Sequence, residues 1–361
     1  MTTKGLRVAV IGCGRIATSG HLPSLAEIAP TGLGRAVAVC DMDRDRGEQV
    51  ARQFDLPFFS SLEETILRAE PDVVTLATLP PSHRALAVRA LDAGCHVLCE
   101  KPIAMNLAEA VEMVAAAERN KRLLSVCFEY RYWDEAKYLR QRIARGDLGH
   151  VHFIRTWGGG VHELVGSSPR RHLATSGGGV LTHWTIHNLD LALWLLGHPD
   201  PLTASAFGYQ RLARLPAAAV LSWLGDVGRY DPEIEDFASG FIRLANGTAL
   251  TVEANFLQAP ATRPEGWEIL ADRATAEISP IRVWLDRGDT WLDDTPPPGT
   301  LARCDYRMTR LIAGFLERVR DGGPPPVSGP EILRVQGLMD ALYKSMAIGR
   351  EVAIPGLVGQ R

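Results

Sequence analysis

The sequence predicts an α/β protein of two domains: one with a doubly wound parallel sheet, then an α+β domain with a mostly antiparallel sheet. Three observations lead to this prediction. A glycine-rich turn directly follows the apolar run at residues 6–10. Strand-like and helix-like segments then alternate as far as residue 126, as in parallel sheets covered on both faces. Beyond it, strand-like runs follow one another between turn residues, which favours antiparallel pairing. We therefore expect domains at 1–126 and 127–361.

In the first domain, short apolar runs predict the strands, and helix-forming segments separate them. The expected strands are Val8 to Ile11, Ala36 to Cys40, Val73 to Ala77, His96 to Cys99 and Leu123 to Phe128. The helices between them include Ala85 to Ala93, which Gly94 ends, and Leu107 to Asn120. Crossovers of this kind bring the carboxyl ends of all the strands to one edge of the sheet.

In the second domain, strands and helices are expected from the same signals. The strands are His150 to Trp157, Thr203 to Gly208, Asp236 to Leu244, Ala249 to Phe256, Trp267 to Ala271 and Ala274 to Ser279. Asn246 and Gly247 form a typical hairpin turn between two of them. The helices are expected at 135–145, 188–196, 307–321 and 330–349.

Length and composition are those of an ordinary globular protein. The 361 residues suffice for two cores, with 46% hydrophobic and 22% charged residues. A formal net charge of -3 without a basic block gives no electrostatic footprint for nucleic acid. No apolar stretch is long enough to cross a membrane, and the N-terminus shows no signal-peptide pattern. The six cysteines lack metal-ligand spacing, which favours buried thiols in the reducing cytoplasm.

The turn from Gly12 to Ala17 follows the pattern G-x-G-x-x-A. Gly12 permits a tight turn, Gly14 lets the backbone approach phosphates, and Ala17 keeps the helix close to the strand. Free N–H groups at the helix start can then bind phosphate charge. We expect Gly12, Gly14, Arg15 and Ile16 to bind the pyrophosphate of a dinucleotide.

Asp41 follows the second strand, where this fold places an acid against the adenosine ribose. A carboxylate there accepts hydrogen bonds from both ribose hydroxyls and repels a 2′-phosphate, so NAD is the predicted cofactor. Arg44 and Arg46 follow closely and could face a 2′-phosphate, which leaves NADP as the alternative. A second interpretation is that Asp41 caps the helix that begins near Arg44.

Two further segments lie where parallel strands end, and the reactive end of a dinucleotide lies at that edge. The first ends a strand and opens a helix, and we expect its Thr78, Pro80 and His83 to contact the cofactor. The second places Glu100 and Lys101 before a proline, and both are also expected at the cofactor. Because Lys101 emerges from an apolar run, we interpret it as a site residue rather than a surface lysine.

Several motifs together carry a resemblance to a known family. They are the glycine turn, the triplet Glu100-Lys101-Pro102, the stretch Gly177 to Asp190 and the stretch Asp321 to Gly329, so the resemblance covers nearly the whole chain. The sequence resembles the glucose-fructose oxidoreductase and inositol dehydrogenase (Gfo/Idh/MocA) family. This implies an N-terminal Rossmann domain, a C-terminal domain on a large open sheet, and hydride transfer between nicotinamide and a sugar, cyclitol or related alcohol.

By matching positions, the resemblance implies that Lys101 is the catalytic lysine and His187 the catalytic histidine. An imidazole titrates near neutral pH, so His187 can accept the proton of a secondary alcohol as its hydride leaves. The Lys101 ammonium can stabilise developing negative charge on the same oxygen. We predict that both side chains converge on one substrate oxygen. A hydrogen-bonded core histidine is the alternative interpretation of His187.

His183 occupies a position where family members commonly carry an aspartate, four residues before His187. A carboxylate there would orient the substrate, whereas an imidazole often carries no charge. Three explanations stay open: altered substrate choice, a proton path in which His183 shares the catalysis, or lost catalysis. The i,i+4 spacing could also place both rings on a metal, but no nearby acid or thiol supplies an evident third ligand, so we predict none.

Substrate contacts are expected from neighbouring segments. Glu129 stands where relatives often have asparagine, and it either adds negative charge near the substrate or pairs with Arg131. An arginine pair on the loop before the glycine run suits a carboxylate or phosphate, although loop arginines are often simply exposed. The residues of that loop are Trp157, His162, Arg170, Arg171 and His172. The predicted substrate-binding residues are Lys101, Glu129, Arg131, Trp157, Arg170, Arg171, His183 and His187.

These residues predict an NAD(P)-dependent oxidoreductase for a small molecule, namely a sugar, amino sugar or cyclitol, without nucleic-acid or membrane partners. One alternative is a redox-neutral enzyme with tightly bound NAD that isomerises its substrate or cleaves a glycoside. Another is a dinucleotide-binding protein without catalysis. Because an exposed sheet face is costly in water, we also expect a homodimer or homotetramer.

Overall fold

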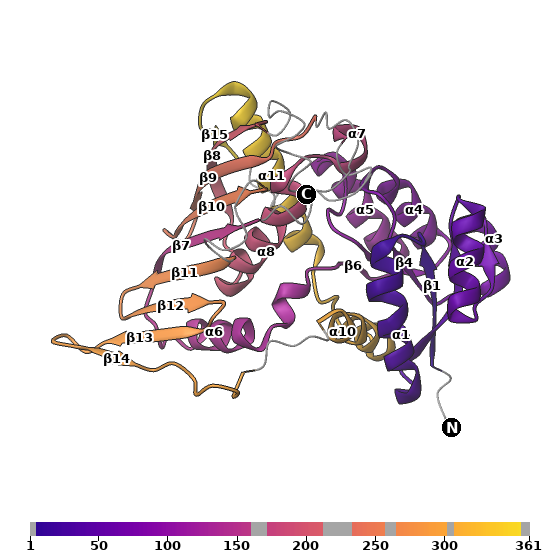
Figure 1. Cartoon of the computed structure of the whole chain (residues 1–361), viewed down its shortest axis with the longest axis horizontal. Helices are drawn as coiled ribbons and strands as arrows, with labels where there is room; N and C mark the ends of the chain where they lie inside the picture. Colours follow the sequence, from indigo (N-terminus) through magenta and orange to yellow (C-terminus); the bar gives the residue numbers. More distant parts are fainter. Residues whose placement is uncertain (1–4, 160–171, 212–232, 257–264, 302–306, 355–361) are drawn as a thin grey trace, which may run out of the picture. The chain divides into compact units, whose positions relative to one another are not determined.

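The computed structural model describes residues 5–159, 172–211, 233–256, 265–301 and 307–354. The chain forms two compact units (Figure 1). The first comprises Met1–Glu129 and Asp305–Leu333, and the second comprises Tyr130–Cys304 and Arg334–Arg361.

The first unit is built on a six-stranded parallel sheet with the order β3-β2-β1-β4-β5-β6. The strands are β1 (Leu6–Ile11), β2 (Gly34–Cys40), β3 (Phe58–Phe59), β4 (Val73–Leu76), β5 (His96–Cys99) and β6 (Leu124–Val126). Strand order reverses at β1, which is the doubly wound topology that the sequence predicts. Val8, Ala9 and Val10 are fully buried, as expected of a strand covered on both faces.

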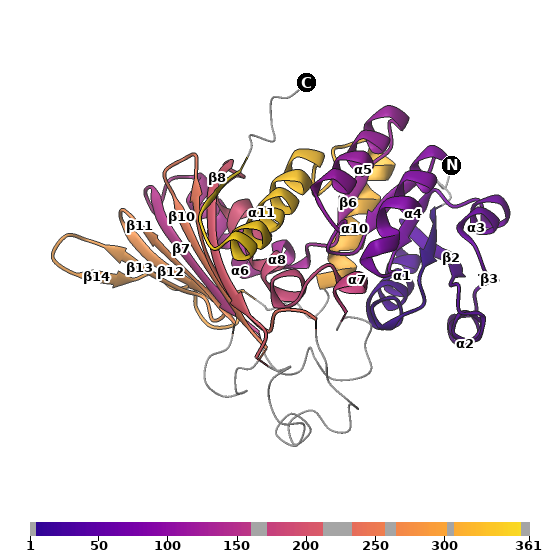
Figure 2. The same ribbon diagram turned by 90° about the horizontal axis from the view of Figure 1, so that it is seen from above.

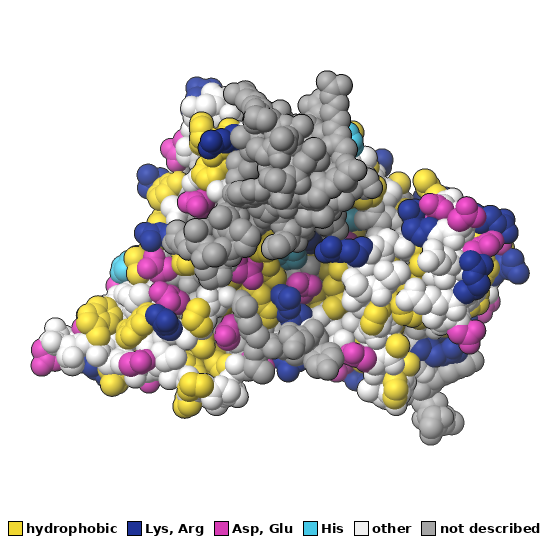
Figure 3. Space-filling model, viewed as in Figure 1, with side chains coloured by type: hydrophobic (Ala, Val, Ile, Leu, Met, Phe, Trp, Pro, Cys, Tyr) yellow, Lys and Arg dark blue, Asp and Glu magenta, His cyan; other side chains and the backbone are white. Residues whose placement is uncertain are grey.

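Helices connect these strands, and side-chain caps begin several of them. They are η1 (Ala17–His21), α1 (Leu22–Ile28), η2 (Ala29–Thr31), α2 (Arg44–Phe54), α3 (Leu62–Ala69), α4 (Pro80–Asp92) and α5 (Leu107–Asn120). Asp43, Ser61 and Asn106 each accept a hydrogen bond from the backbone N–H three residues later. In Figure 3, acidic and basic side chains lie next to one another on the visible surface of α2 and α3, where Arg68 pairs with Glu64 at 3.0 Å.

Helix α10 (Arg307–Asp321) belongs to the first unit, whereas the sequence prediction assigns every residue after 127 to the second domain. It packs against α1, and its apolar side chains Leu311, Ile312, Phe315 and Leu316 are buried. Thr309 donates hydrogen bonds to Ser24 at 3.0 Å and to Glu27 at 2.8 Å. The boundary therefore differs from the expected one because this distant helix buries its apolar face on the first sheet's helix layer.

Within the described residues, the second unit contains a nine-stranded sheet with the order β14-β13-β12-β11-β7-β10-β9-β8-β15. Its strands are β7 (Val151–Gly158), β8 (Pro201–Tyr209), β9 (Phe237–Leu244), β10 (Ala249–Asn255), β11 (Gly266–Ala271), β12 (Ala274–Ile278), β13 (Arg282–Asp286), β14 (Trp291–Asp293) and β15 (Val352–Ala353). Only β7 and β10 pair in parallel among these strands, which confirms the mostly antiparallel prediction.

One face of this sheet carries helices, as Figure 2 shows. They are α6 (Asp134–Ala144), α8 (Ile186–Leu195) and α11 (Gly329–Ile348). Side chains alternate along β9: Ala238 and Ile242 are fully buried, whereas Phe241 is partly exposed on the other face. Phe207 of β8, which lies opposite Ser239 of β9, is 63% exposed. In the described chain, the second face of the sheet therefore has no helix over it.

Most predicted elements occur within a few residues of their expected bounds. Gly247 has a φ of 87° in the hairpin turn between β9 and β10. The sequence prediction missed β3, β13, β14 and β15, which are short or lie at sheet edges. The cysteines that the structure describes are buried and unbridged. Among the described residues, none of the helices combines the length and apolar content that a bilayer crossing requires.

Candidate active site

The glycine turn joins β1 to a helix that begins at Arg15 and continues through η1 into α1. Gly12 has a φ of 96°, and a Cβ atom there would lie 2.7 Å from the carbonyl oxygen of Ala77. A Cβ at Gly14 would meet none of the described atoms within 4 Å. The first amides of the helix therefore border open space, and the turn fits the pyrophosphate of a dinucleotide.

Asp41 lies beside this turn at the end of β2. Its carboxylate accepts hydrogen bonds from the backbone amides of Cys13 at 2.7 Å and Asp43 at 2.8 Å, and from the Arg46 guanidinium at 2.8 and 3.1 Å. Burial opposes ionisation, but these hydrogen bonds outweigh it and lower the pKa of Asp41. Asp43 caps α2, so the capping interpretation of Asp41 is wrong. Asp41 is instead an ionised acid next to the turn, and Arg46 covers it.

Arg44, the other cation considered for a 2′-phosphate, faces elsewhere. Its guanidinium pairs with Glu48 one turn along α2, with 2.8 Å between Nε and Oε1. The side chain of Arg44 is 77% exposed. Of the two arginines, only Arg46 therefore contacts the acid that follows β2.

The end of β4 carries Thr78, Pro80 and His83. Thr78 is partly exposed and its hydroxyl accepts a hydrogen bond from Ser82 at 2.7 Å, whereas Pro80 and His83 are buried. The ring nitrogens of His83 lie 2.9 Å from the Pro102 carbonyl oxygen and 3.1 Å from that of Thr78. Burial lowers the pKa of His83, so the ring is neutral and donates to one of these oxygens. His83 therefore holds the ends of β4 and β5 together, and its cofactor contact stays a prediction.

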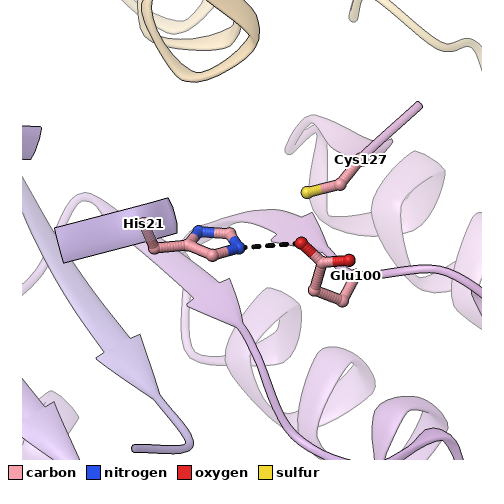
Figure 4. A group of neighbouring side chains, drawn as sticks. All are labelled: His21, Glu100 and Cys127. Atoms are coloured by element: carbon pink, nitrogen blue, oxygen red, sulfur yellow. Dashed lines mark hydrogen bonds and ion pairs between the residues drawn. The ribbon is translucent and has the colours of Figure 1, made fainter. Parts of the chain in front are cut away.

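Glu100, which Figure 4 shows, and Lys101 follow β5, but only Lys101 is partly exposed. The Glu100 carboxylate turns inward, where it accepts hydrogen bonds from Nε2 of His21 at 2.9 Å and from the Lys101 amide at 3.2 Å. Burial opposes its charge, but the His21 hydrogen bond and the charges of His21 and Lys101 lower the pKa of Glu100. Glu100 is therefore a buried anion that anchors the backbone before Lys101, and its cofactor contact stays a prediction.

Cys127, just after β6, completes a buried group with His21 and Glu100 (Figure 4). One ligand atom from each residue lies within 4.8 Å of the others. Burial, together with the nearby Glu100 and Cys99, raises the pKa of the Cys127 thiol well above its usual value. The thiol therefore stays protonated beside the Glu100 carboxylate. Folding assembles this group from three separate segments of the chain.

Glu129 and Arg131 lie in η3 (Glu129–Tyr132) and do not pair with each other. Oε1 of Glu129 lies 3.4 Å from Nη1 of Arg307. Arg131 forms a two-point ion pair with Asp190 at 2.6 and 2.8 Å, with side chains 4% and 1% exposed. Arg131 therefore ties η3 to α8 inside the core, and its substrate contact stays a prediction. A buried, paired guanidinium cannot leave its partner without leaving an uncompensated charge.

His183 and His187 lie on η6 (Leu181–Thr185) and α8, and both are partly exposed. Glu235 fixes the start of η6, because it accepts hydrogen bonds from the amides of Gly179 at 2.9 Å and Leu181 at 3.1 Å. Burial raises the pKa of Glu235 despite these contacts. A Cβ atom at Gly179 would overlap the backbone of Glu235, which explains a glycine at this position.

An aromatic cluster holds one face of His187. Its ring stacks on Tyr130 with 4.8 Å between ring centroids and 24° between planes. Tyr130 also stacks on Trp133 at 4.1 Å and contacts the edge of Trp267 at 5.6 Å. The Tyr130 hydroxyl donates a hydrogen bond to Glu265 at 3.1 Å. His187 is thus a partly exposed imidazole with a fixed orientation, and not an enclosed core histidine.

Trp157 lies in β7 rather than on a loop. Side chains alternate along β7, so Trp157 points to the face opposite that of Gly158, whose Cβ position is filled by Trp184 of η6. The substrate contact of Trp157 stays a prediction. His172 is exposed at the start of α7 (Leu173–Ser176), whereas His162, Arg170 and Arg171 lie outside the described residues.

The sequence prediction does not include four residues whose contacts shape the site: His21, Tyr130, Glu235 and Arg307. A signal exists only for His21: it follows the buried Ala17 by four residues on one helix, so both face the sheet. The other three contact residues that are distant in sequence. No local pattern marks such contacts.

Both units match one protein family. Residues 6–128 match the model described as an oxidoreductase family with an NAD-binding Rossmann fold, and residues 136–277 match the GFO/IDH/MocA C-terminal domain. The chain is 28% identical over 360 residues to D-glucoside 3-dehydrogenase of Escherichia coli (strain K12). The alignment covers 98% of this chain and 99% of that protein. It is 24% identical over 363 residues to myo-inositol 2-dehydrogenase of Thermotoga maritima. That alignment covers 98% of this chain and 100% of that protein.

A solved structure shares the fold over almost the whole chain. It is a levoglucosan dehydrogenase in complex with NADH and L-sorbose, with a TM-score of 0.86 and 21% sequence identity. The superposition covers 98% of this chain and 100% of that one.

Proposed function

The chain belongs to the GFO/IDH/MocA family of NAD-binding oxidoreductases, and we propose that its substrate is a sugar, amino sugar or cyclitol. A hydroxyl-bearing carbon of this substrate is oxidised, or the corresponding ketone is reduced. The E. coli and T. maritima relatives are named for a D-glucoside and for myo-inositol, both polyhydroxylated rings. These names support the substrate class.

In this proposal, bound NAD supplies hydride transfer, and the chain controls the substrate oxygen. His187 accepts the hydroxyl proton during oxidation and returns it during reduction. The Lys101 ammonium donates a hydrogen bond to the same oxygen and stabilises its negative charge. His183 binds a neighbouring hydroxyl, so that the chain keeps the family chemistry with its own choice of substrate.

One observation carries the proposal. Lys101 follows β5, two positions along the sheet from the glycine turn that follows β1, with β4 between them. Both therefore lie at the carboxyl edge of a doubly wound sheet, where such folds bind their ligands. The buried Glu100 keeps the backbone before Lys101 in place. The pyrophosphate contacts proposed for Gly12, Gly14, Arg15 and Ile16, and the ribose contact of Asp41, use the same edge.

The experiment mixes the protein with NAD+ and each member of a panel of sugars and cyclitols. It then follows absorbance at ~340 nm, where the reduced nicotinamide ring absorbs. We expect reduction with at least one compound, and loss of at least about 100-fold in kcat for Lys101→Ala and His187→Ala. Lys344→Ala, on the exposed side of α11, serves as the matched control. Full turnover by both site variants contradicts the assignment. Product without net NADH identifies the redox-neutral alternative instead.

We also propose that two copies of the chain associate through the helix-free face of the nine-stranded sheet. Phe207 is 63% exposed there, and Tyr209 stacks on Phe237 of the neighbouring strand at 4.9 Å. An aromatic surface of this kind is costly in water, and a second sheet face would cover it. The unbridged, buried cysteines favour the cytoplasm as the compartment.

A further inference from the structure

The charge of Lys101 acts on two carboxylates of the first unit, Glu100 and Glu129. Their environments differ. Glu100 is committed to the protein, because Oε1 accepts a hydrogen bond from His21 and Oε2 accepts one from the Lys101 amide. The Cys127 thiol lies in the same buried group. Glu100 has little capacity left for a ligand.

Glu129 is the second carboxylate. It lies just after β6, the strand next to β5, and so follows the same edge of the sheet as Lys101. Its side chain is 24% exposed, and its contact with Arg307 is 3.4 Å long. Among the described residues, no side-chain or backbone group donates a closer hydrogen bond to it. A carboxylate offers about four lone-pair sites, so Glu129 keeps acceptor capacity that a bound molecule can use.

The charges around Glu129 come from three elements. Arg307 at the start of α10 and Lys101 after β5 favour its ionised form, as does His21 of η1, whereas Glu100 opposes it. Burial is the largest effect, and the pKa of Glu129 lies above its usual value. In its ionised form this carboxyl group is a hydrogen-bond acceptor only.

We propose that Glu129 is the group through which this protein selects substrates that present a hydroxyl or ammonium donor beside Lys101, and rejects sugars that carry a carboxylate there. This inference rests on the proposed function and narrows its substrate class to sugars and cyclitols with a hydroxyl or ammonium group beside Lys101. A hydroxyl or ammonium donor satisfies the free lone pairs of Glu129. A carboxylate ligand has no donor to offer, and it meets a like charge in a partly buried site.

The test compares glucose with two sugars that each differ from it in one group: glucosamine, with an ammonium at C2, and glucuronate, with a carboxylate at C6. For the unmodified protein, we expect kcat/KM for the neutral or amino sugar to exceed that for glucuronate by about 100-fold, because a site with a buried, unpaired polar group rejects the poor match strongly. In Glu129→Gln this ratio falls at least about tenfold, since the amide carries no charge and can donate to a carboxylate. Glu129→Asn, which also shortens the side chain, lowers the ratio in the same direction.

Two measurements keep the result interpretable. The Kd for NADH, from nicotinamide fluorescence, shows whether each variant remains folded and binds cofactor. Glu118→Gln, an exposed glutamate of α5, is the matched control and keeps both the ratio and the activity. If Glu129→Gln turns over the neutral sugars with an unchanged ratio to glucuronate, the inference is overturned while the proposed function stands. If the unmodified protein binds NADH but turns over no sugar or cyclitol, both fail.

Discussion

Tyr130 stacks on the ring of His187 with 4.8 Å between ring centroids and 24° between planes. A stacked aromatic pair contributes about 0.5–1.5 kcal/mol beyond its buried area. The stack therefore holds the His187 imidazole in one plane. The hydrogen bond from Tyr130 to Glu265, at 3.1 Å, holds the phenol ring in this position.

The first prediction concerns this stack. In Tyr130→Leu the His187 imidazole loses the aromatic ring that fixes its orientation, so we expect kcat to fall by about tenfold, because a misplaced catalytic group loses rate steeply. Tyr130→Phe keeps the ring and is the control, with kcat close to its original value. An unchanged kcat in Tyr130→Leu contradicts the role given to the stack.

The second prediction concerns the acid at the ribose end. Because Arg46 covers the Asp41 carboxylate, its cation lies where a 2′-phosphate would approach. Arg46→Ala should weaken binding of NADPH by about tenfold, or ~1.4 kcal/mol, while NADH binds as tightly as before or more tightly. Fluorescence titration with both cofactors measures the two Kd values. Arg44→Ala, whose side chain pairs with Glu48 in solvent, should change neither. Equal losses for both cofactors would refute the assignment.

The third prediction concerns the buried pair of His21 and Glu100. His21→Leu leaves the Glu100 charge in the core without its main partner, so we expect the free energy of unfolding to fall by about 3 kcal/mol. Adding Glu100→Gln removes the charge and should recover part of this loss. Urea unfolding of the single and double variants measures the difference. A double variant that is less stable by the sum of both single effects would show that the two side chains do not act as a pair.

The fourth prediction concerns stability at low pH. Burial, with a contribution from the Arg122 charge, lowers the pKa of His96 from 6.5 to about 4, and its Nδ1 accepts a hydrogen bond from the Leu123 amide at 2.9 Å. Between these two values the unfolded chain binds a proton that the folded chain does not, so His96 makes stability fall as the pH drops from 6.5 to 4. His96→Gln should flatten this slope in urea unfolding measured at successive pH values. An unchanged slope would exclude His96 as its source.

The fifth prediction concerns the helix-free sheet face. Phe207→Glu places a charge on the proposed interface, so we expect light scattering to show a shift from oligomer to monomer at micromolar concentration. Leu67→Glu, on an exposed site of α3 that is 78% accessible, is the control and leaves the oligomer intact. A monomeric unmodified protein would contradict the proposed association.

The elements of the fold are largely predictable from the sequence. The run Val8 to Val10, the glycine turn at Gly12 and the hairpin pair at Asn246 each specify their structure through local geometry. Strand and helix periods are properties of neighbouring residues, so a reader of the sequence can find them. The short edge strands β3 and β14 lack enough residues for such a pattern.

The partners of the charged side chains depend on the tertiary structure. Arg131 and Asp190 are 59 residues apart in sequence, and His21 and Glu100 are 79 apart. Nothing near Arg131 in the sequence distinguishes a buried ion pair from a substrate contact. The chain by itself therefore determined the fold class, the family and the glycine turn. Only the folded protein decided which acids and bases are satisfied internally, because long-range packing, and not local sequence, sets the burial and the partner of each charge.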